Sequence, residues 1–337
     1  MLALGMMWNG LYKMSNIMQD NAAVTKWAIE YLSAHDYILN QPYEIVSAMP
    51  WSQVIRFTTN KGIIYCKQTV FYIEPTIMQI LRKFAPDNIP EIIATNNLLS
   101  CFLIKDAGNL LRDILKNNYN EILFCKAITT YANLQKAATQ HIDLFLQAGA
   151  LDHSLKTLPN LYLQLINKKE LLLKDGLTTA EIDDLYELHP NLVEQCKLLA
   201  QYKIPETIEH GDFHDNNILI QGEKISIHDW GEVTITHPFF SLASCLYMAT
   251  YPSIHNLQEN GEKYLVLQNC YLKNWLEYAP MNKLVEAFLL IKKLRHFQFV
   301  LDFSRIKMCK GMDELPRYNG CIAKPLRKFI GIFKNNL

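Results

Sequence analysis

The feature that most restricts the fold of this chain is the octapeptide HGDFHDNN at residues 210–217, together with the segment that follows it. Residues 218–227 contain two short apolar runs separated by the turn-forming tetrapeptide QGEK. This pattern predicts a β-hairpin. Asn217 would lie where the first strand begins and Asp229 just after the second strand ends, so the hairpin would bring their side chains together.

Three oxygen-bearing side chains of this region suit the transfer of a phosphoryl group. Such a transfer has a loose transition state, so a protein contributes mainly by positioning the reactants and neutralising charge. Asp212 is the candidate catalytic residue that orients an acceptor hydroxyl and accepts its proton. Asn217 and Asp229 are the candidate metal ligands, because Mg2+ prefers carboxylate and amide oxygen.

The two motifs, His210-Gly211-Asp212-x-His214-x-x-Asn217 and Asp229-Trp230, resemble the signature of the aminoglycoside phosphotransferase and choline kinase family of small-molecule kinases. The resemblance implies an α+β, protein-kinase-like fold with two lobes, a small N-terminal lobe built on an antiparallel sheet and a larger, mainly helical C-terminal lobe. It also implies Mg2+ as cofactor and ATP or GTP as co-substrate. His214, a second candidate catalytic residue, would either contact the transferred phosphate or brace the loop.

Composition is that of an ordinary soluble enzyme, with 337 residues of which 50% are apolar and 20% charged. A formal net charge of zero argues against a nucleic-acid or anionic-membrane partner. The run Met1–Trp8 lacks a basic leader and a cleavage site, so we expect a tail there and no signal peptide. We expect a cytoplasmic protein whose eight scattered cysteines are mostly buried, reduced thiols.

We expect three divisions of the chain: an N-terminal tail and helix over residues 1–40, a nucleotide-binding lobe over 41–106, and a catalytic and substrate lobe over 107–337. Apolar spacing predicts a helix at 21–35 that caps the first lobe. Alternation and turn residues predict the strands of that lobe at 43–48, 53–59, 63–69, 89–94 and 98–104.

Lys67 is the candidate phosphate-binding residue of the first lobe. By strict alternation Lys67 shares a strand face with Ile63 and Tyr65, which suits a side chain that lines a cleft. The alternative is that Lys67 is a solvent-exposed residue on an edge strand. The resemblance implies that a Glu on the following helix pairs with this Lys. Glu74 is the only acid between Lys67 and Pro86, although Pro75 would place it at the very end of the helix.

Residues 103–105 (Leu103, Ile104 and Lys105) occupy the place of the family's hinge between lobes. The resemblance implies that their backbone hydrogen-bonds the nucleotide base, although a plain linker would have the same sequence. The loop near residues 47–52 contains no glycine, so backbone cradling of the phosphates as in protein kinases is in doubt.

The second lobe is predicted to be helical. Residues 120–148 form a long amphipathic segment, and Thr178 with Glu181 forms a capping box that opens a helix leading toward Tyr202. Further helices are predicted at 239–250, 262–278, 282–306 and 326–333.

The acceptor is expected to be a small molecule with a hydroxyl group, such as a metabolite, amino alcohol, sugar or antibiotic. Only a short segment separates Asp229 from the helix near Phe239, whereas protein kinases need a long activation segment there. The tail beyond residue 310 is rich in Lys and Arg, so if it lines the pocket a neutral or anionic acceptor is favoured. Four aromatic residues would form either a cage for a quaternary amine or part of the core: Tyr247, Tyr251, Trp275 and Tyr278.

Two positions depart from the family pattern. Ser241 stands where many relatives have an Asp that braces the catalytic loop, which puts the rigidity of the loop in doubt. His228 stands where an apolar residue is common, and we expect a buried, neutral histidine. The alternative to an active kinase is therefore a catalytically weak or inactive kinase-like protein that still binds nucleotide.

Overall fold

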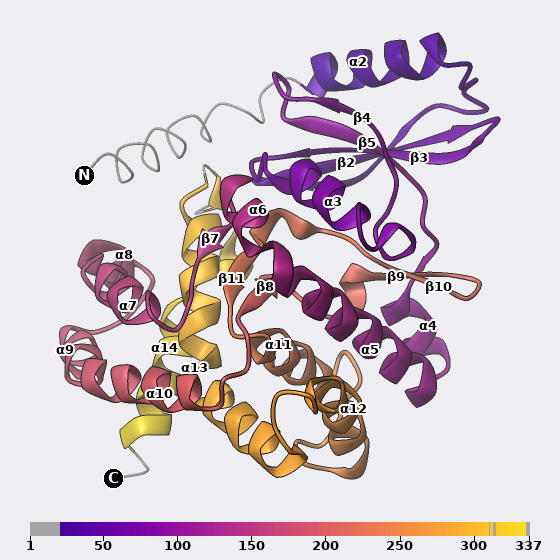
Figure 1. Cartoon of the computed structure of the whole chain (residues 1–337). Helices are drawn as coiled ribbons and strands as arrows, with labels where there is room; N and C mark the ends of the chain where they lie inside the picture. The colour runs from indigo at the N-terminus through magenta and orange to yellow at the C-terminus, as the bar shows by residue number, and fades with distance from the viewer. Residues whose placement is uncertain (1–20, 310, 313–314, 335–337) are drawn as a thin grey trace.

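The computed structural model of this chain has two lobes, a small one containing a five-stranded sheet and a larger one composed mainly of helices (Figure 1). This arrangement confirms the predicted α+β fold class. The structure describes residues 21–309, 311–312 and 315–334, so the tail expected at Met1–Trp8 lies outside the described residues. None of the helices in these ranges is long and apolar enough to cross a membrane.

The N-terminal lobe is an antiparallel sheet with the order β1-β2-β3-β5-β4. Strand β2 alternates between partly exposed and buried residues, and its buried Ile55 and Phe57 pack against Val24, Ala28 and Leu32 of helix α2. The predicted helix therefore covers one face of the sheet. The elements are α2 (Asn21–Ala34), β1 (Glu44–Met49), β2 (Ser52–Thr59), β3 (Gly62–Thr69), α3 (Glu74–Arg82), β4 (Ile92–Asn96) and β5 (Cys101–Lys105).

Helix α3 connects the two lobes. It buries Ile77, Met78 and Leu81 in the same hydrophobic core as the helices of the C-terminal lobe, and it lies between the sheet and helices α5 and α6 in Figure 1. This shared core fixes the position of the sheet relative to the C-terminal lobe, which carries most of the predicted site residues.

Two predicted long helices are divided in the structure. The segment at 120–148 becomes α5, a short 3-10 turn and α6, and the Thr139 hydroxyl donates to the Lys136 carbonyl at the break, a local bond that competes with helix continuation. The segment leading to Tyr202 is divided at Leu188, where Pro190 starts a new helix because it has no N–H to donate to the preceding turn. The capping box of Thr178 and Glu181 is confirmed.

The hairpin predicted after the octapeptide is formed by β9 and β10, and β9 also pairs with β6, which follows the link between the lobes. A second small sheet has the order β7-β11-β8. The elements are β6 (Asn109–Leu110), α4 (Leu111–Asn117), α5 (Glu121–Ala138), α6 (Ile142–Gln147), β7 (Leu151–Asp152), α7 (Leu158–Ile166), α8 (Lys169–Lys174), α9 (Thr179–Glu187), α10 (His189–Gln201), β8 (Thr207–Glu209), β9 (Ile218–Gln221), β10 (Lys224–Ile227), β11 (Thr234–Thr236), α11 (Phe239–Ala249), α12 (Glu262–Leu272), α13 (Met281–Lys307) and α14 (Ala323–Lys334).

One pair of cysteines departs from the expectation of reduced thiols. Cys125 of α5 and Cys270 of α12 form a disulfide, because these two helices pack along each other and bring the side chains together. The other six cysteines are free, and four of them are buried: Cys66, Cys101, Cys196 and Cys245.

Candidate active site

A cleft of about 820 Å3 lies between the lobes and is lined from both of them. Most of the site residues predicted from sequence reach it, namely Lys67, Ile104, Lys105, Asp212, His214, Asn217 and Asp229. Glu74 lies behind Lys67, and Leu103 is fully buried in the core of the N-terminal lobe with α2. The hairpin thus brings together residues that are up to 162 positions apart in the chain.

The catalytic loop begins directly after β8 and makes a sharp turn at Gly211. This residue has φ +85°, and a Cβ atom there would lie 2.5 Å from the Cβ of Glu232. Both the left-handed backbone and the close approach require glycine. The turn directs the side chain of the next residue, Asp212, into the cleft.

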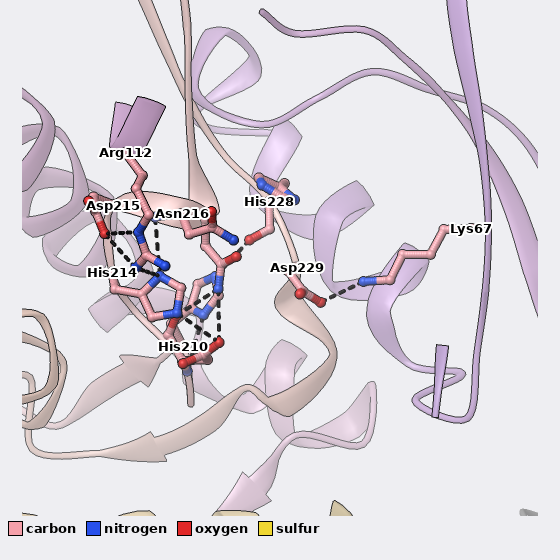
Figure 2. A network of polar contacts seen from close by, with 10 residues as sticks. Lys67, Arg112, His210, His214, Asp215, Asn216, His228 and Asp229 are labelled. Atoms are coloured by element: carbon pink, nitrogen blue, oxygen red, sulfur yellow. Dashed lines mark hydrogen bonds and ion pairs between the residues drawn. The ribbon is translucent and has the colours of Figure 1, made fainter. Parts of the chain in front are cut away.

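Asp212, His214 and Asn217 form one hydrogen-bonded unit within this loop, part of the network in Figure 2. The amide Nδ2 of Asn217 donates to the Asp212 carbonyl at 2.8 Å and to its Oδ2 at 3.2 Å. Nδ1 of His214 accepts from the Asn216 N–H at 3.1 Å, so Nε2 carries the proton and donates to Oδ2 of Asp212 at 3.1 Å. Although burial opposes ionisation, His214 lowers the pKa of Asp212.

Asp229 is held beside this unit by the base of the hairpin. The His228 N–H donates to the Asn217 carbonyl at 3.1 Å, which extends the β9–β10 pairing to the two predicted metal ligands. Asp229 itself has φ 68° and ψ 53°, a left-handed conformation that Asp tolerates better than most residues. The expected neutral state of His228 agrees with the structure, since burial lowers its pKa to about 4.

Lys67 of β3 reaches across the cleft to Asp229 and also pairs with Glu74. Its Nζ lies 2.5 Å from Oδ1 of Asp229, the dashed contact on the right of Figure 2, and 2.8 Å from Oε1 of Glu74. Partial removal from solvent in the cleft works against ionisation of Asp229, yet Lys67 keeps its pKa well below the usual value. Burial raises the pKa of Glu74 to about 7, with Lys67 acting in the opposite direction. The predicted pair of Lys67 and Glu74 is present although Glu74 is the first residue of α3.

The side chains of Asn217 and Asp229 fit the requirements of a magnesium ion. Because Nδ2 of Asn217 donates to Asp212, its Oδ1 remains available as a neutral oxygen ligand. The Asp229 side chain is 48% exposed, faces the cleft and is kept ionised by Lys67. Mg2+ is usually bound by one or two carboxylates plus water and substrate phosphates, so a small protein donor set of this kind suits it.

The hinge and the loop over the phosphates agree only in part with the sequence prediction. Ile104 and Lys105 line the cleft, and the adjoining residues 106–108 continue the wall. Leu103 does not, because it lies on the face of β5 that packs against α2. The hairpin of β1 and β2 contributes Ser47, Met49, Trp51 and Ser52 to the cleft, and the segment 47–52 contains no glycine.

A buried network beneath the loop was not found from sequence. Asp215 accepts from Nε of Arg112 at 3.0 Å, from its Nη2 at 2.7 Å and from Nε2 of His255 at 2.6 Å. Asp215 stands within the octapeptide, so its presence was visible, but Arg112 and His255 lie 103 and 40 positions away with no local signal. The network ties the loop to α4, and the cluster on the left of Figure 2 shows the contact of Arg112 with Asp215.

Ser241 takes part in a second brace that replaces the missing Asp. Its hydroxyl donates to Oε1 of Glu209 at 3.0 Å, and Oε2 of Glu209 accepts from the Gly211 N–H at 2.7 Å. The Tyr131 hydroxyl lies 2.7 Å from Oγ of Ser241 and accepts from the His210 N–H at 3.2 Å. Backbone donors of the loop are therefore bound by a glutamate and a tyrosine, with Ser241 linking the two.

The end of the cleft opposite the hinge is acidic and aromatic. Glu232 lines it, and burial together with Asp212 and Asp229 raises the pKa of Glu232 well above its usual range. Asp302 of α13 also lines it and is 4% exposed, with Nδ1 of His153 3.3 Å from its Oδ1 and with Oδ2 accepting from Gln298 at 3.0 Å. Phe299 and Phe303 complete this wall.

The tail beyond residue 310 reaches the cleft with Tyr318 and Cys321, whereas none of its described Lys and Arg residues lines it. Arg327 and Lys334 pair with Glu181 and Asp184 of α9 instead of facing the cleft. The aromatic cage is also absent from the described residues. Trp275 is fully buried, and the ring face of Tyr247 is covered by Arg295 at 3.5 Å.

Comparison with solved structures shows the same fold in small-molecule kinases. Ethanolamine kinase of Plasmodium vivax is 15% identical, with a TM-score of 0.62 over 96% of this chain and 93% of that one. The ADP-bound aminoglycoside phosphotransferase APH(2'')-Ib is 15% identical, with a TM-score of 0.59 over 93% and 99%. Choline kinase of Cryptosporidium parvum Iowa II is 12% identical, with a TM-score of 0.59 over 87% and 89%.

The sequence comparison agrees with the fold. No curated protein matches the sequence. The model of the phosphotransferase enzyme family (APH) matches residues 74–269, a range that includes the octapeptide and Asp229. The match covers more than half of the chain and confirms the resemblance drawn from the motifs. The chain belongs to the phosphotransferase enzyme family.

Proposed function

We propose that this protein is a magnesium-dependent kinase that transfers the terminal phosphoryl group of ATP or GTP to a hydroxyl group of a small, amine-bearing acceptor. The observation that carries the proposal is the convergence of Asp212, Asn217, Asp229 and Lys67 at one cleft, with Asp212 placed by two neighbours. The ADP bound to a structural relative, APH(2'')-Ib, agrees with a nucleotide site in this fold.

In this proposal each side chain has a separate task. Asp212 orients the acceptor hydroxyl and takes its proton, while His214, both of whose ring nitrogens already have partners, positions Asp212 by donating to Oδ2. Lys67, held by Glu74, neutralises charge on the nucleotide phosphates. Mg2+, bound through Asn217 and Asp229, would supply charge neutralisation between the phosphate oxygens. The backbone of residues 104–108 is the proposed contact for the base.

An amine on the acceptor follows from the acidic end of the cleft. The cationic side chains that line the cleft are already paired, Lys67 with Asp229, Lys105 with Glu91 and Arg112 with Asp215. Glu232 and Asp302 line the cleft and form no ion pair with a Lys or Arg among the described residues, although Nδ1 of His153 lies 3.3 Å from Oδ1 of Asp302. An ammonium group at this end of the cleft would be attracted to both side chains and would favour the ionised form of Glu232.

The test is nucleotide consumption measured with a panel of amino alcohols, aminoglycosides and neutral sugars. Amine-bearing acceptors should be phosphorylated, and their N-acetyl derivatives should lose activity because acetylation removes the charge. Glu232→Gln should raise KM for an amine acceptor about tenfold or more and leave KM for nucleotide nearly unchanged. Turnover only with neutral or anionic acceptors would reject the amine assignment.

The same assay separates an active kinase from a catalytically weak nucleotide-binding protein. An active enzyme should hydrolyse nucleotide slowly in the presence of Mg2+ even without acceptor, because water can replace the hydroxyl. Nucleotide binding without hydrolysis or transfer to any acceptor would instead support the weak or inactive alternative.

A further inference from the structure

A second cavity of about 820 Å3 lies in the C-terminal lobe and shares no lining residue with the cleft. Its walls come mainly from α11, α12, α13 and α14, the group of helices in the lower half of Figure 1. Its apolar lining includes Ala243, Tyr264, Leu289 and Leu290. None of the residues assigned to phosphoryl transfer lines this space.

Its charged lining is cationic, although the whole chain has no net charge. Four cations, Lys292, Lys293, Arg295 and Lys328, face two acids, Glu259 and Glu286, so four minus two leaves a charge of +2.

Both acids of the second cavity already have a basic partner. Glu259 pairs with Lys292, and Glu286 pairs at 2.7 Å with Lys283, which is not a lining residue. No carboxylate of the described residues pairs with Lys293, Arg295 or Lys328. His296 adds no charge, because burial and then Arg295 lower its pKa to about 3.

Arg295 is the least expected of these cations, because it is only 7% exposed. Its guanidinium lies over the Tyr247 ring at 3.5 Å from the centroid, and Nη2 contacts the His296 ring at 3.0 Å. Neither contact neutralises its charge. A buried guanidinium without an anion is energetically costly, so an anionic ligand would supply the negative charge that no carboxylate of the described residues places beside Arg295.

Lys328 is held at the same tyrosine. Its Nζ donates to the Tyr247 hydroxyl at 2.8 Å and lies 5.2 Å from the ring centroid. Although burial acts in the other direction, this hydrogen bond helps to lower the pKa of Tyr247. One tyrosine therefore places two cations from different helices, α13 and α14, at one end of the cavity.

We propose that this second cavity binds a small phosphate monoester, with the phosphate at Arg295 and Lys328 and the organic part against the apolar wall. A planar guanidinium beside an ammonium matches the oxygens of a phosphate dianion, and the tyrosine hydroxyl adds a polar contact. The apolar wall favours an organic ester over the bare ion. The inference does not depend on the proposed kinase activity.

The test is calorimetric titration of the full chain with phenyl phosphate and with inorganic phosphate, at constant ionic strength set with chloride. Phenyl phosphate should bind with one site and more tightly than inorganic phosphate. Lys328→Met should weaken binding about tenfold or more. Lys328 is exposed, so this variant should fold. Arg295→Lys, which keeps the charge but loses the guanidinium fork, should also weaken binding.

Two variants locate the site. Lys324→Met removes a cation one turn earlier on α14, outside the cavity, and should bind phenyl phosphate as the wild type does. Lys67→Met removes the cation of the cleft and should also retain this binding. Absence of binding to the wild type, equal affinity in Lys328→Met, or loss of binding in Lys67→Met would each overturn the proposal, the last by placing the phosphate in the cleft.

Discussion

The side-chain amide of Asn217 donates to both the carbonyl oxygen and the carboxylate of Asp212, at 2.8 Å and 3.2 Å. The proposed proton acceptor and the proposed metal ligand, which are five residues apart in the sequence, are therefore held together by direct hydrogen bonds. A loop with this internal bond needs little rearrangement when substrates arrive, which is what a reaction dominated by positioning requires.

Replacing Asp212 by Ala should separate catalysis from binding. Turnover should fall about 100- to 10,000-fold because the acceptor hydroxyl loses its proton acceptor. Nucleotide affinity, measured by titration, should stay within a few-fold, since Asp212 is not a predicted metal or phosphate ligand. His214→Gln should give a smaller loss of turnover, because it removes only the donor that positions Asp212. Unchanged turnover in Asp212→Ala would reject the assignment.

Asp229→Asn should abolish the Mg2+-dependent part of nucleotide binding. Asn tolerates the left-handed backbone at this position, so the change removes the charge without adding strain. In the wild type, nucleotide with Mg2+ should raise the melting temperature and EDTA should remove that rise, whereas in the variant EDTA should make no difference. Asp87→Asn, which removes a carboxylate of an exposed ion pair, is the matched control. A rise that persists in Asp229→Asn and still responds to EDTA would contradict the metal assignment.

Ser241→Ala should loosen the catalytic loop. The change removes the hydroxyl that links Glu209 to Tyr131, and we expect a loss of about 1–3 kcal/mol in the free energy of unfolding together with a fall in kcat. Ser304→Ala is the control, because that buried hydroxyl bonds only a carbonyl of its own helix.

Ser241→Asp should not repair the site, although it restores the residue common in relatives. A second carboxylate would lie against Glu209, whose pKa burial already raises to about 8. Denaturant unfolding should therefore show lower stability than in the wild type, and more so above pH 8, where both groups must ionise. A more stable Ser241→Asp variant would show that Glu209 does not act as the replacement brace.

His237 should make the fold sensitive to acid. Burial lowers its pKa to about 3, below the value near 6.5 of an unfolded chain. The unfolded state therefore binds a proton first as pH falls, and stability should decline from about pH 6.5 towards pH 3. The contribution of His237 to this loss in the free energy of unfolding is about 2 kcal/mol at pH 5. His237→Asn keeps an acceptor for the Phe239 N–H and does not titrate, so its unfolding free energy should fall less between pH 7 and pH 5. Parallel declines in both proteins would contradict this.

The hairpin and its three polar side chains were predictable because the signal is local. Strand alternation, a turn tetrapeptide and two carboxylates within a short stretch determine that geometry almost alone. Lys67 and Glu74 were found through the resemblance and by elimination among few acids. The strands and most helices followed from periodicity, whereas breaks at Thr139 and Leu188 depend on single side-chain or proline effects inside continuous apolar patterns.

What sequence reasoning missed depends on contacts between distant segments. Ser241 drew attention as a departure, but its compensation by Glu209 and Tyr131 became visible only when β8, α5 and α11 were packed together. The direction of the basic tail likewise follows from the acids of α9 with which Arg327 and Lys334 pair. Composition of the tail alone could not place these cations, because the sequence of a helix does not identify the neighbour that its charges face.

Helix α13 has 27 residues and is therefore about 40 Å long. Arg295 and His296 stand in the wall of the second cavity, and Phe299 and Asp302, about one to two turns further on, stand in the wall of the cleft. Because α13 is one continuous helix, a displacement of the turn that lines one cavity would also displace the turn that lines the other. Changes of acceptor preference acquired through α13 would therefore also reshape the cationic cavity, so the two binding properties are expected to evolve together.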